Sequence, residues 1–535
     1  MNKLKAETNA EFKPAAIELP RTKQILVLIA IYLTTASVNM LSTMISQSGV
    51  RAVAELGGTD YYALQFTLWT LLSTVTIPFF GKLGDMYGRK PFFIGGMALI
   101  ALSHITIALT PSMGVFMFAR CVMGVGCGSI FANYLSVLGE ISNTKTRPVY
   151  MGIYAIVVGF TMIVGPLLSG GIIDMMGWRS VYWFLTILAV VTLAFFFPGM
   201  PSMKGAGAKT RLDWGGGITV TLFSLGLLLA FTWGGRQYEW ASPQIIGLFA
   251  GAAVFLVAFI IIERKAENPI LPLYLFKNRM FTACAIGMMF FGPTVYSFTS
   301  YSSMIGQGVL GMSATLSGST LSVHAVGYLI TGAITGAIIS RTGKLKAVHM
   351  VMLLIVGGSM VMFSSLNANT SPAFVFTMQF ISGFGMGPLI GTFTQLIQGS
   401  VENEHIGTAT ALLQFVMKIG GTIGITFGGF LFNRTWGRGL SSVVTPEVQT
   451  AIPADTLSAM STSGFLNSAD AIAELRSTVD AANTGVFDNM ILQMKGLLSS
   501  SVAAIFTFCT ICLAIAIILV ATIRTKKQQP EQQGQ

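Results

Sequence analysis

The stretch "GKLGDMYGRKP" (81–91) crowds four charges and three glycines between two long apolar runs. The runs are "FTLWTLLSTVTIPFF" (66–80) before it and "FFIGGMALIALSHITIAL" (92–109) after it. Runs of this kind are long enough, with their flanking residues, to cross a bilayer core of about 30 Å as helices. The stretch therefore predicts a tight, charged turn between two membrane-spanning helices.

The composition of the whole chain agrees with this reading. Hydrophobic residue types make up 53% of the 535 residues and charged types only 10%, whereas soluble domains contain about 25% charged residues. Backbone groups in lipid must be hydrogen-bonded within their own segment, so apolar runs of this length predict helices. We predict fourteen spans: 25–46, 62–81, 92–111, 114–138, 149–172, 180–198, 215–233, 244–262, 281–303, 315–339, 347–365, 373–397, 407–432 and 499–522.

The distribution of basic residues predicts the orientation of the chain. If the N-terminus lies inside the cell, 23 of the 32 Lys and Arg residues fall in inner segments and seven in outer ones. This is the positive-inside bias, and it places both termini in the cytoplasm. The net charge of +11 therefore reflects topology, and no nucleic-acid partner is expected.

The spans suggest a division into two bundles. We expect a cytoplasmic tail (1–24), a six-helix bundle (25–198) and a linker (199–280) that contains the two extra helices 215–233 and 244–262. A second six-helix bundle (281–522) includes a long outer segment (433–498), which we expect to be partly helical and to cap the outer end. Residues 523–535 form a second cytoplasmic tail. The motif "CTIC" (509–512) lies inside an apolar window, so we interpret it as packing and expect no metal or cofactor.

The two halves also resemble each other in sequence. "GKLGDMYGRK" from Gly81 is echoed by "GAIISRTGKL" from Gly336, and a second glycine follows seven residues later in both, at Gly88 and Gly343. "RCVMGVGCG" (120–128) is echoed by "QFISGFGMG" (379–387). Repeated bundles are typical of secondary transporters, whose substrate site lies where the repeats meet.

These motifs resemble the major facilitator superfamily, and within it the fourteen-helix drug:H+ antiporter family. The opening stretch is similar to the superfamily's signature loop, and "GIYAIVVGFTMIVGPLLSGG" (152–171), with Gly165 and Pro166, is similar to the fifth-helix signature of its exporters. The resemblance implies two helical bundles that alternate in access to the two sides of the membrane. It implies a gating role for Gly81, Asp85, Gly88, Arg89, Lys90, Gly165 and Pro166.

The resemblance also implies a position for Asp85. It places the carboxylate at the cytoplasmic start of the thirteenth span, around Gly407 and Thr408. A carboxylate at a helix N-terminus is stabilised by the helix dipole, by about 0.3–1 kcal/mol when exposed. We expect this contact to hold the bundles together on the inner side. The alternative is a solvated turn whose charges serve topology alone.

Two charges fall inside the predicted spans, and both are positive. Arg120 lies in the fourth span and Lys418 in the thirteenth. Such charges are costly in lipid and should face the bundle interior or a wet cavity. Arg120 is expected near the first span, where it either contacts substrate or bonds helix carbonyls and hydroxyls. The aspartate that the family's cation exporters carry in the first helix is replaced here by Leu41, which favours anionic or neutral amphiphiles as substrates.

Other polar and adaptable side chains on the first, ninth, twelfth and thirteenth spans complete the candidate cavity. The family's fold makes the first, fourth, ninth and twelfth helices line it, and Gln414 lies one turn before Lys418. The candidate cavity residues are Asn39, Arg120, Met289, Tyr296, Gln379, Gln395, Gln414 and Lys418. His324 is a candidate proton site, with a hydrogen-bonded structural histidine as the alternative.

The leading hypothesis is a secondary transporter of the plasma membrane that exports hydrophobic or amphiphilic compounds, with protons as the coupling ion. Besides the small-molecule substrate and lipid, no partner is expected, and the chain should be a monomer. An organic-anion symporter or facilitator is the alternative, and a sensor without transport is a remote one. Neither a cluster of catalytic residues nor a nucleotide-binding "GxxxxGK[ST]" occurs in the sequence, so an enzyme and an ATP-driven pump are not expected.

Overall fold

The computed structural model describes residues 19–56, 62–143, 145–200, 213–235, 237–266, 269, 273–312, 314–367, 370–402, 405–453, 457, 466, 469–480 and 483–522. These residues form helices and their connections, apart from one isolated bridge between Gly234 and Tyr238. Most of the predicted tails, 1–24 and 523–535, and most of the linker segment before the extra helices lie outside the described residues.

The helices group into the two predicted bundles. The N-terminal bundle contains α2 (Arg21–Glu55), α3 (Tyr62–Tyr87), α4 (Arg89–Leu109), α5 (Met113–Glu140), α6 (Arg147–Met176) and α7 (Trp178–Gly199). The C-terminal bundle contains α10 (Arg279–Met304), α11 (Ala314–Thr342), α12 (Leu345–Ser364), α13 (Pro372–Met386), α14 (Leu389–Gln398), α15 (Ile406–Val443) and α19 (Thr484–Ala521). Short one-turn segments, η3 (Leu273–Lys277) and η4 (Ile305–Val309), flank α10.

The prediction of an all-helical membrane protein is confirmed. Thirteen helices among the described residues are long and apolar enough to cross a membrane, and they coincide with thirteen of the predicted windows. The remaining window, 62–81, is covered by α3. The window 373–397 is interrupted at Gly387 and Pro388, where α13 ends and α14 begins, because proline cannot donate a backbone hydrogen bond.

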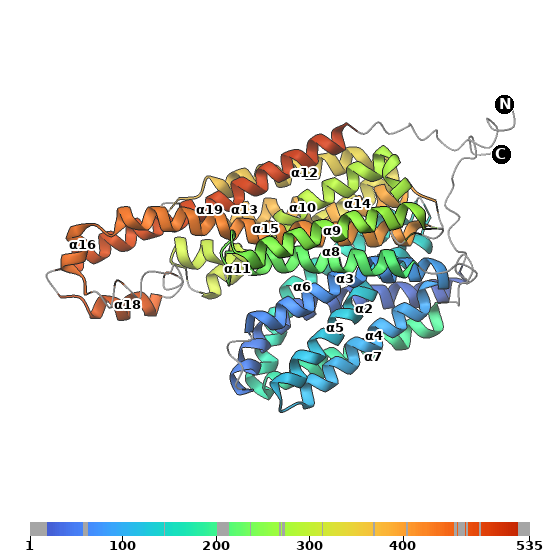
Figure 1. Cartoon of the computed structure of the whole chain (residues 1–535), viewed down its shortest axis with the longest axis horizontal. Helices are drawn as coiled ribbons and strands as arrows, with labels where there is room; N and C mark the ends of the chain where they lie inside the picture. The colour runs from blue at the N-terminus through green and yellow to red at the C-terminus, as the bar shows by residue number, and fades with distance from the viewer. Residues whose placement is uncertain are drawn as a thin grey trace.

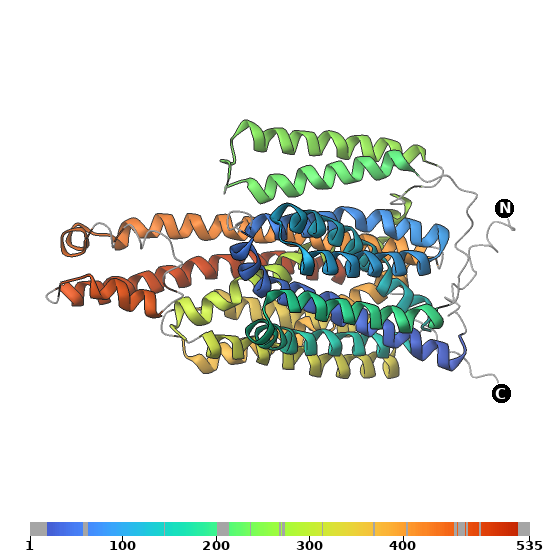
Figure 2. The same cartoon turned by 90° about the horizontal axis from the view of Figure 1, so that it is seen from below.

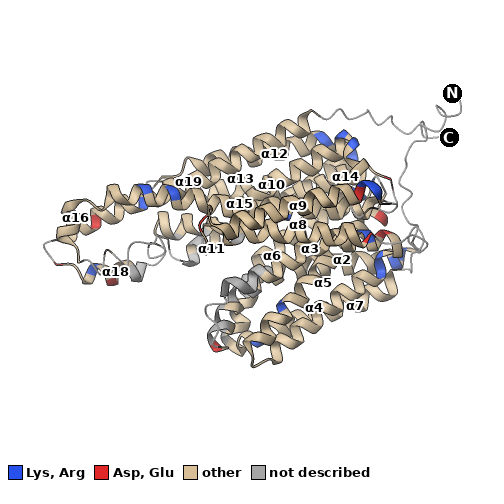
Figure 3. Ribbon diagram, viewed as in Figure 1, with Lys and Arg blue, Asp and Glu red and all other residues tan. Residues whose placement is uncertain are grey.

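The bundles meet at one end and diverge at the other. Figure 1 shows both groups of helices converging where α2 begins and α19 ends, which we call the proximal end. Toward the opposite, distal end the N-terminal bundle swings away from the C-terminal one. Figure 3 shows Lys and Arg gathered at the proximal end, while the middle of the bundles carries few charges.

The two extra helices, α8 (Trp214–Trp233) and α9 (Pro243–Lys265), form a separate pair beside the bundles (Figure 2). Helix α8 follows the seam where the bundles meet. Near the proximal end Trp214 packs on Phe79 of α3, with ring centroids 5.5 Å apart. Near the distal end Trp240, in the connection between the pair, packs on Phe430 of α15 at 6.3 Å. Helix α8 thus touches both bundles.

The outer segment differs from the expected cap. Helices α15 and α19 each contain 38 residues, or about 57 Å at about 1.5 Å per residue, nearly twice the bilayer core. Together with α16 (Pro446–Ala451) and α18 (Ala469–Ser477) they project along the long axis and leave the N-terminal bundle uncovered (Figure 1). The predicted windows ended at Phe432 and began again at Ser499, but both helices continue beyond these residues because Trp436, Phe487 and Met494 are buried.

Candidate functional site: the contact between the two bundles

The charged turn joins α3 to α4 at the proximal end. Helix α3 ends at Tyr87 and α4 begins at Arg89, so the whole connection is Gly88. Gly88 has φ of 85°, a left-handed conformation that side-chain-bearing residues rarely adopt. Across this single-residue turn, Asp85 near the end of α3 comes within ion-pair distance of Arg89, the first residue of α4.

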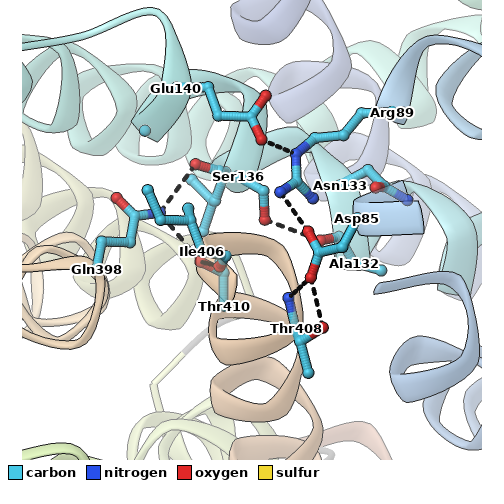
Figure 4. A network of polar contacts seen from close by, with 12 residues as sticks. Asp85, Arg89, Ala132, Asn133, Ser136, Glu140, Gln398, Ile406, Thr408 and Thr410 are labelled. Atoms are coloured by element: carbon cyan, nitrogen blue, oxygen red, sulfur yellow. Dashed lines mark hydrogen bonds and ion pairs between the residues drawn. The ribbon is translucent and has the colours of Figure 1, made fainter. Parts of the chain in front are cut away.

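Asp85 connects the N-terminal bundle to the start of α15. Its Oδ2 accepts a hydrogen bond from the backbone N–H of Thr408 at 2.6 Å, and the Thr408 hydroxyl donates to the same oxygen. Helix α15 begins at Ile406, so this N–H belongs to its first turn, where no intrahelical acceptor is available. The carboxylate therefore binds the positive end of a helix dipole across the seam (Figure 4).

Arg89 holds this carboxylate from the other side. Its Nη2 lies 2.7 Å from Asp85 Oδ1, and its Nε lies 2.5 Å from Glu140 Oε1 at the end of α5. The Arg89 side chain is only 2% exposed. Two carboxylates thus share one buried guanidinium, and Figure 4 shows the chain of contacts from Glu140 through Arg89 and Asp85 to Thr408. We call these four residues the charged latch.

Glycines allow the helices to approach closely at the latch. A Cβ on Gly407 would lie 2.0 Å from Arg89 Nη1 and 2.1 Å from Asp85 Oδ1. A Cβ on Gly81 would lie 2.4 Å from the Cβ of Ala411 in α15. The Gln398 side chain in α14 adds a neutral bridge, because its amide donates to the Leu135 carbonyl at 3.2 Å. The bundles are therefore in direct contact from the turn itself to α14.

The repeat of this turn in the second half makes a different contact. Gly343, with φ of 66°, joins α11 to α12 as Gly88 joins α3 to α4. A Cβ on Gly336 would lie 2.8 Å from the Pro148 carbonyl, and one on Gly152 would lie 2.6 Å from the Gly332 carbonyl. Backbone-to-backbone packing of small residues thus joins α11 to α6. A weaker, neutral polar contact lies here as well: Ser340 donates to the Lys145 carbonyl at 2.9 Å.

Lys418 lies farther along the same seam. Its ammonium donates to Ser73 Oγ of α3 at 2.9 Å and lies 3.8 Å from the ring centroid of Phe131 in α5. The side chain is 5% exposed. Lys418 belongs to the C-terminal bundle, but its charge is therefore held by the N-terminal one.

Arg120, by contrast, lies inside the N-terminal bundle. Its Nη2 donates to the Tyr182 hydroxyl of α7 at 2.8 Å, and its guanidinium lies 5.0 Å from the Phe116 ring. The Tyr182 hydroxyl is also 3.4 Å from Ser48 in α2. The expected approach to α2 is therefore made through Tyr182. Thr34 and Asn39 of α2 bond carbonyls of their own helix.

The remaining candidate residues lie within the C-terminal bundle. Gln379 donates to Ser302 at 2.6 Å, and His324 shares a 2.8 Å hydrogen bond with Ser382 and stacks on Phe298 at 4.3 Å. These are the contacts of a buried, hydrogen-bonded histidine. Four more candidates occupy α10, α14 and α15: the Met289 carbonyl and the Tyr296 ring pack on the glycine pair 420–421, and Gln395 and Gln414 are buried.

Besides Gly81 and Gly88, three more predicted gating residues, Lys90, Gly165 and Pro166, are not part of the charged latch. The Lys90 ammonium donates to the Phe197 carbonyl of α7 at 2.9 Å and sits over the Phe197 ring at 5.0 Å. Lys90 therefore joins α4 to α7 within one bundle. Gly165 is buried in α6, and the Pro166 side chain lies outside the described side chains.

Comparisons with known proteins identify the family. The Major Facilitator Superfamily model matches residues 25–425. The chain belongs to the major facilitator superfamily. Multidrug transporter protein MdtP of Bacillus subtilis is 30% identical over 416 residues, covering 78% of this chain and 76% of that protein. Multidrug resistance protein 3 of the same organism is 27% identical and covers 90% and 91%.

Solved structures show the same superfamily fold. The human organic anion transporter MFSD10 superposes with a TM-score of 0.59 at 12% identity, over 94% of this chain and all of that one. The Escherichia coli fucose:proton symporter FucP gives 0.53 at 11% identity, over 93% and 97%. The protein is therefore a transporter with the superfamily's two-bundle fold, and not an enzyme.

Sequence reasoning missed several polar residues of this transporter. Glu140 is not among the residues predicted to gate transport, yet it completes the charged latch. His349 is fully buried in α12 and bonds Thr392 at 2.7 Å, although it stood at the edge of an apolar window. Tyr134 and Tyr154, whose hydroxyls lie 3.3 Å apart, carried no pattern that set them apart from packing. Only the repeat of glycines on their helices hinted at the close contact.

Proposed function

We propose that this superfamily member exports hydrophobic or amphiphilic organic compounds across the plasma membrane by alternating access, coupled to proton entry. Two relatives that cover most of the chain are named a multidrug transporter protein and a multidrug resistance protein, and the α6 sequence resembles the exporter signature. The basic residues gathered at the proximal end favour a cytoplasmic location for that end and for both termini.

One observation supports alternating access above all, and it is the bond from Asp85 to the first turn of α15. All the described hydrogen bonds named above that cross between the bundles lie between the proximal end and Lys418. A conformation closed at the proximal end and separated distally corresponds to an outward-facing state. An interface of packed helices tends to have two discrete arrangements. The charged contacts would all be made in one of them and all broken in the other, as a two-state gate requires.

Proteoliposome transport tests this proposal. Purified protein would be reconstituted with a fluorescent cationic, anionic or neutral amphiphile, and a pH gradient would be imposed in either direction. Proton-coupled export predicts that substrate moves in the direction opposite to the flow of protons. It also predicts that an ionophore, by dissipating the proton gradient, stops this movement. Empty liposomes and the Asp85→Asn variant serve as controls.

The runner-up is an organic-anion symporter or facilitator, and the buried Lys418 at the seam favours it. In that case substrate uptake would run with the protons, or would proceed equally well without a gradient. Either result would overturn export, whatever the charge of the substrate that is moved.

A further inference from the structure

The seam contains a cation that has no anionic partner among the described residues. A lysine ammonium has three hydrogen-bond donors, and the described residues offer that of Lys418 one hydroxyl, Ser73, and one ring face, Phe131. Ion pairs among the described residues are formed by Arg89, Arg179 and Arg476 instead. Burying an ammonium without a carboxylate costs free energy. We therefore expect Lys418 to bind a further hydrogen-bond acceptor at some stage of the transport cycle.

A second donor lies on the same face of α15. Gln414 is one helical turn before Lys418 and 2% exposed, and its Nε2 has no hydrogen-bond partner among the described residues. Gly407, Ala411, Gln414 and Lys418 follow at intervals of four, three and four, which places them on one helix face. Gly407 and Lys418 both touch the N-terminal bundle, so this face is the seam.

Aromatic side chains from both bundles surround these donors. The Phe131 ring below Lys418 also meets the Tyr134 ring edge-on, with centroids 6.3 Å apart. Tyr134 shares its hydroxyl contact with Tyr154 of α6, and Tyr296 of α10 and Tyr328 of α11 lie within electrostatic range of Tyr134. We call these four tyrosines the tyrosine cluster. Each pairs an apolar ring with a polar tip, as ligand-contacting tyrosines do.

We propose that Lys418 and Gln414 bind the acidic group of an aromatic organic anion, and that the tyrosine cluster holds its ring system. The Lys418 ammonium and the Gln414 amide both donate hydrogen bonds, so they match a negatively charged acceptor on the ligand. A cationic ligand would be repelled by the ammonium. The anion replaces Ser73 and Phe131 as the partner of Lys418, so its binding competes with a contact between the bundles. This inference rests on the proposed transport function and names its substrate class.

Three probes with one ring system and different charges test it. They are 2-naphthylacetate, 2-(2-naphthyl)ethanol and 2-(2-naphthyl)ethylammonium, each tritiated, with binding to the full chain in lipid nanodiscs measured by scintillation proximity. We expect the acetate to bind about tenfold more tightly than the ammonium. Lys418→Met should weaken acetate binding about tenfold, the usual size of a hydrogen bond to a charged group, and leave the alcohol unchanged. Gln414→Leu should weaken it about threefold.

Matched variants separate binding from folding. Lys265→Met removes an equal charge at the exposed end of α9 and should change nothing. Lys418→Arg keeps the charge, so it should retain the preference for acetate even if Lys418→Met fails to fold. Equal losses for all three probes in a folded Lys418→Met variant, tighter binding of the ammonium, or no saturable acetate binding by the wild type would each overturn the proposal. The binding assay needs no proton gradient. If proton-coupled export fails in proteoliposomes, the test of anion binding therefore still stands on its own.

Discussion

The two turns at the proximal end, 81–90 and 336–345, occupy equivalent places in the two halves but close the seam by different means. The first carries the charged latch, in which Asp85 binds the first turn of α15 and Arg89 binds two carboxylates. The second relies on backbone packing of Gly336 against Pro148, with one hydrogen bond from Ser340.

A duplicated fold can thus become asymmetric through the way each half closes the seam. The stability of close backbone packing depends little on the protonation of nearby groups. The stability of a buried ion network changes with protonation and with small displacements, because it depends on every charge being paired. We infer that the first turn is the gate and the second the pivot. A substitution in one turn can therefore be compared with a matched substitution in the other.

The largest effect is expected for Arg89→Met. The change leaves Asp85 and Glu140 buried without their shared cation, and breaking a buried pair in this way costs about 3–5 kcal/mol. Folded yield and thermal stability on size-exclusion chromatography should fall sharply. Arg341→Met, which removes an exposed charge at the second turn, should be neutral. Addition of Glu140→Gln should restore part of the loss, and equal behaviour of Arg89→Met and Arg341→Met would contradict the latch.

Gly81→Ala should reduce transport about tenfold by separating α3 from α15, since the new methyl would overlap the Ala411 Cβ, 2.4 Å away. The compensating change Ala411→Gly provides the space that the methyl needs. The double variant should therefore recover most of the transport rate in proteoliposomes. If the double variant shows no recovery, contact between the new methyl and Ala411 is not the reason why Gly81→Ala reduces transport.

Ser340→Ala should have a smaller effect. It removes one exposed hydrogen bond to the Lys145 carbonyl, and such a bond contributes about 0.5–1.5 kcal/mol. Because the bond is exposed, we expect the low end of this range, a change in transport rate of about threefold. A loss as large as that of Asp85→Asn, measured at equal expression, would show that the two turns are equally strong gates.

The smallest effect is expected at the distal end, for Glu55→Gln. Trp178 donates to the Glu55 carboxylate at 2.6 Å and Arg179 pairs with it, and these bonds lower the pKa of Glu55. A depressed carboxyl pKa stabilises the folded state above about pH 4.3 and loses this contribution as the pH falls through the lowered value. The thermal unfolding temperature of the wild type should fall slightly at acid pH. The variant should not show this dependence of unfolding temperature on pH. A change in proximal gating would be unexpected.

Much of this architecture was predictable because lipid leaves the chain few choices. Apolar run length located the helices, and the echo of Gly88 in Gly343 identified two turns that share a positive φ. The resemblance placed Asp85 beside Gly407 and Thr408, where it lies. The partners inside each bundle were not predictable. Arg120 and Lys418 looked alike in sequence, yet one bonds Tyr182 within its own bundle and the other crosses the seam, since helix rotation is set by packing.

The distal projection was hidden for a similar reason. Beyond Phe432 the sequence of α15 becomes polar, so the apolar window ended while the helix continued to Val443. Its stability comes from long-range packing of Trp436, Phe487 and Met490. Neither hydropathy nor a motif reports such contacts between residues about fifty positions apart.

The most direct test of the charged latch is a distance measurement across the proximal end in Asp85→Asn. Spin labels at the exposed positions Tyr87 and Lys344, in a background without other accessible thiols, would report the separation of the bundles by pulsed electron paramagnetic resonance. We expect one short distance for the wild type and a second, longer population for Asp85→Asn, because a neutral amide binds Arg89 and the N-terminus of α15 less strongly than a carboxylate does. Superimposable distance distributions for the two proteins would contradict it.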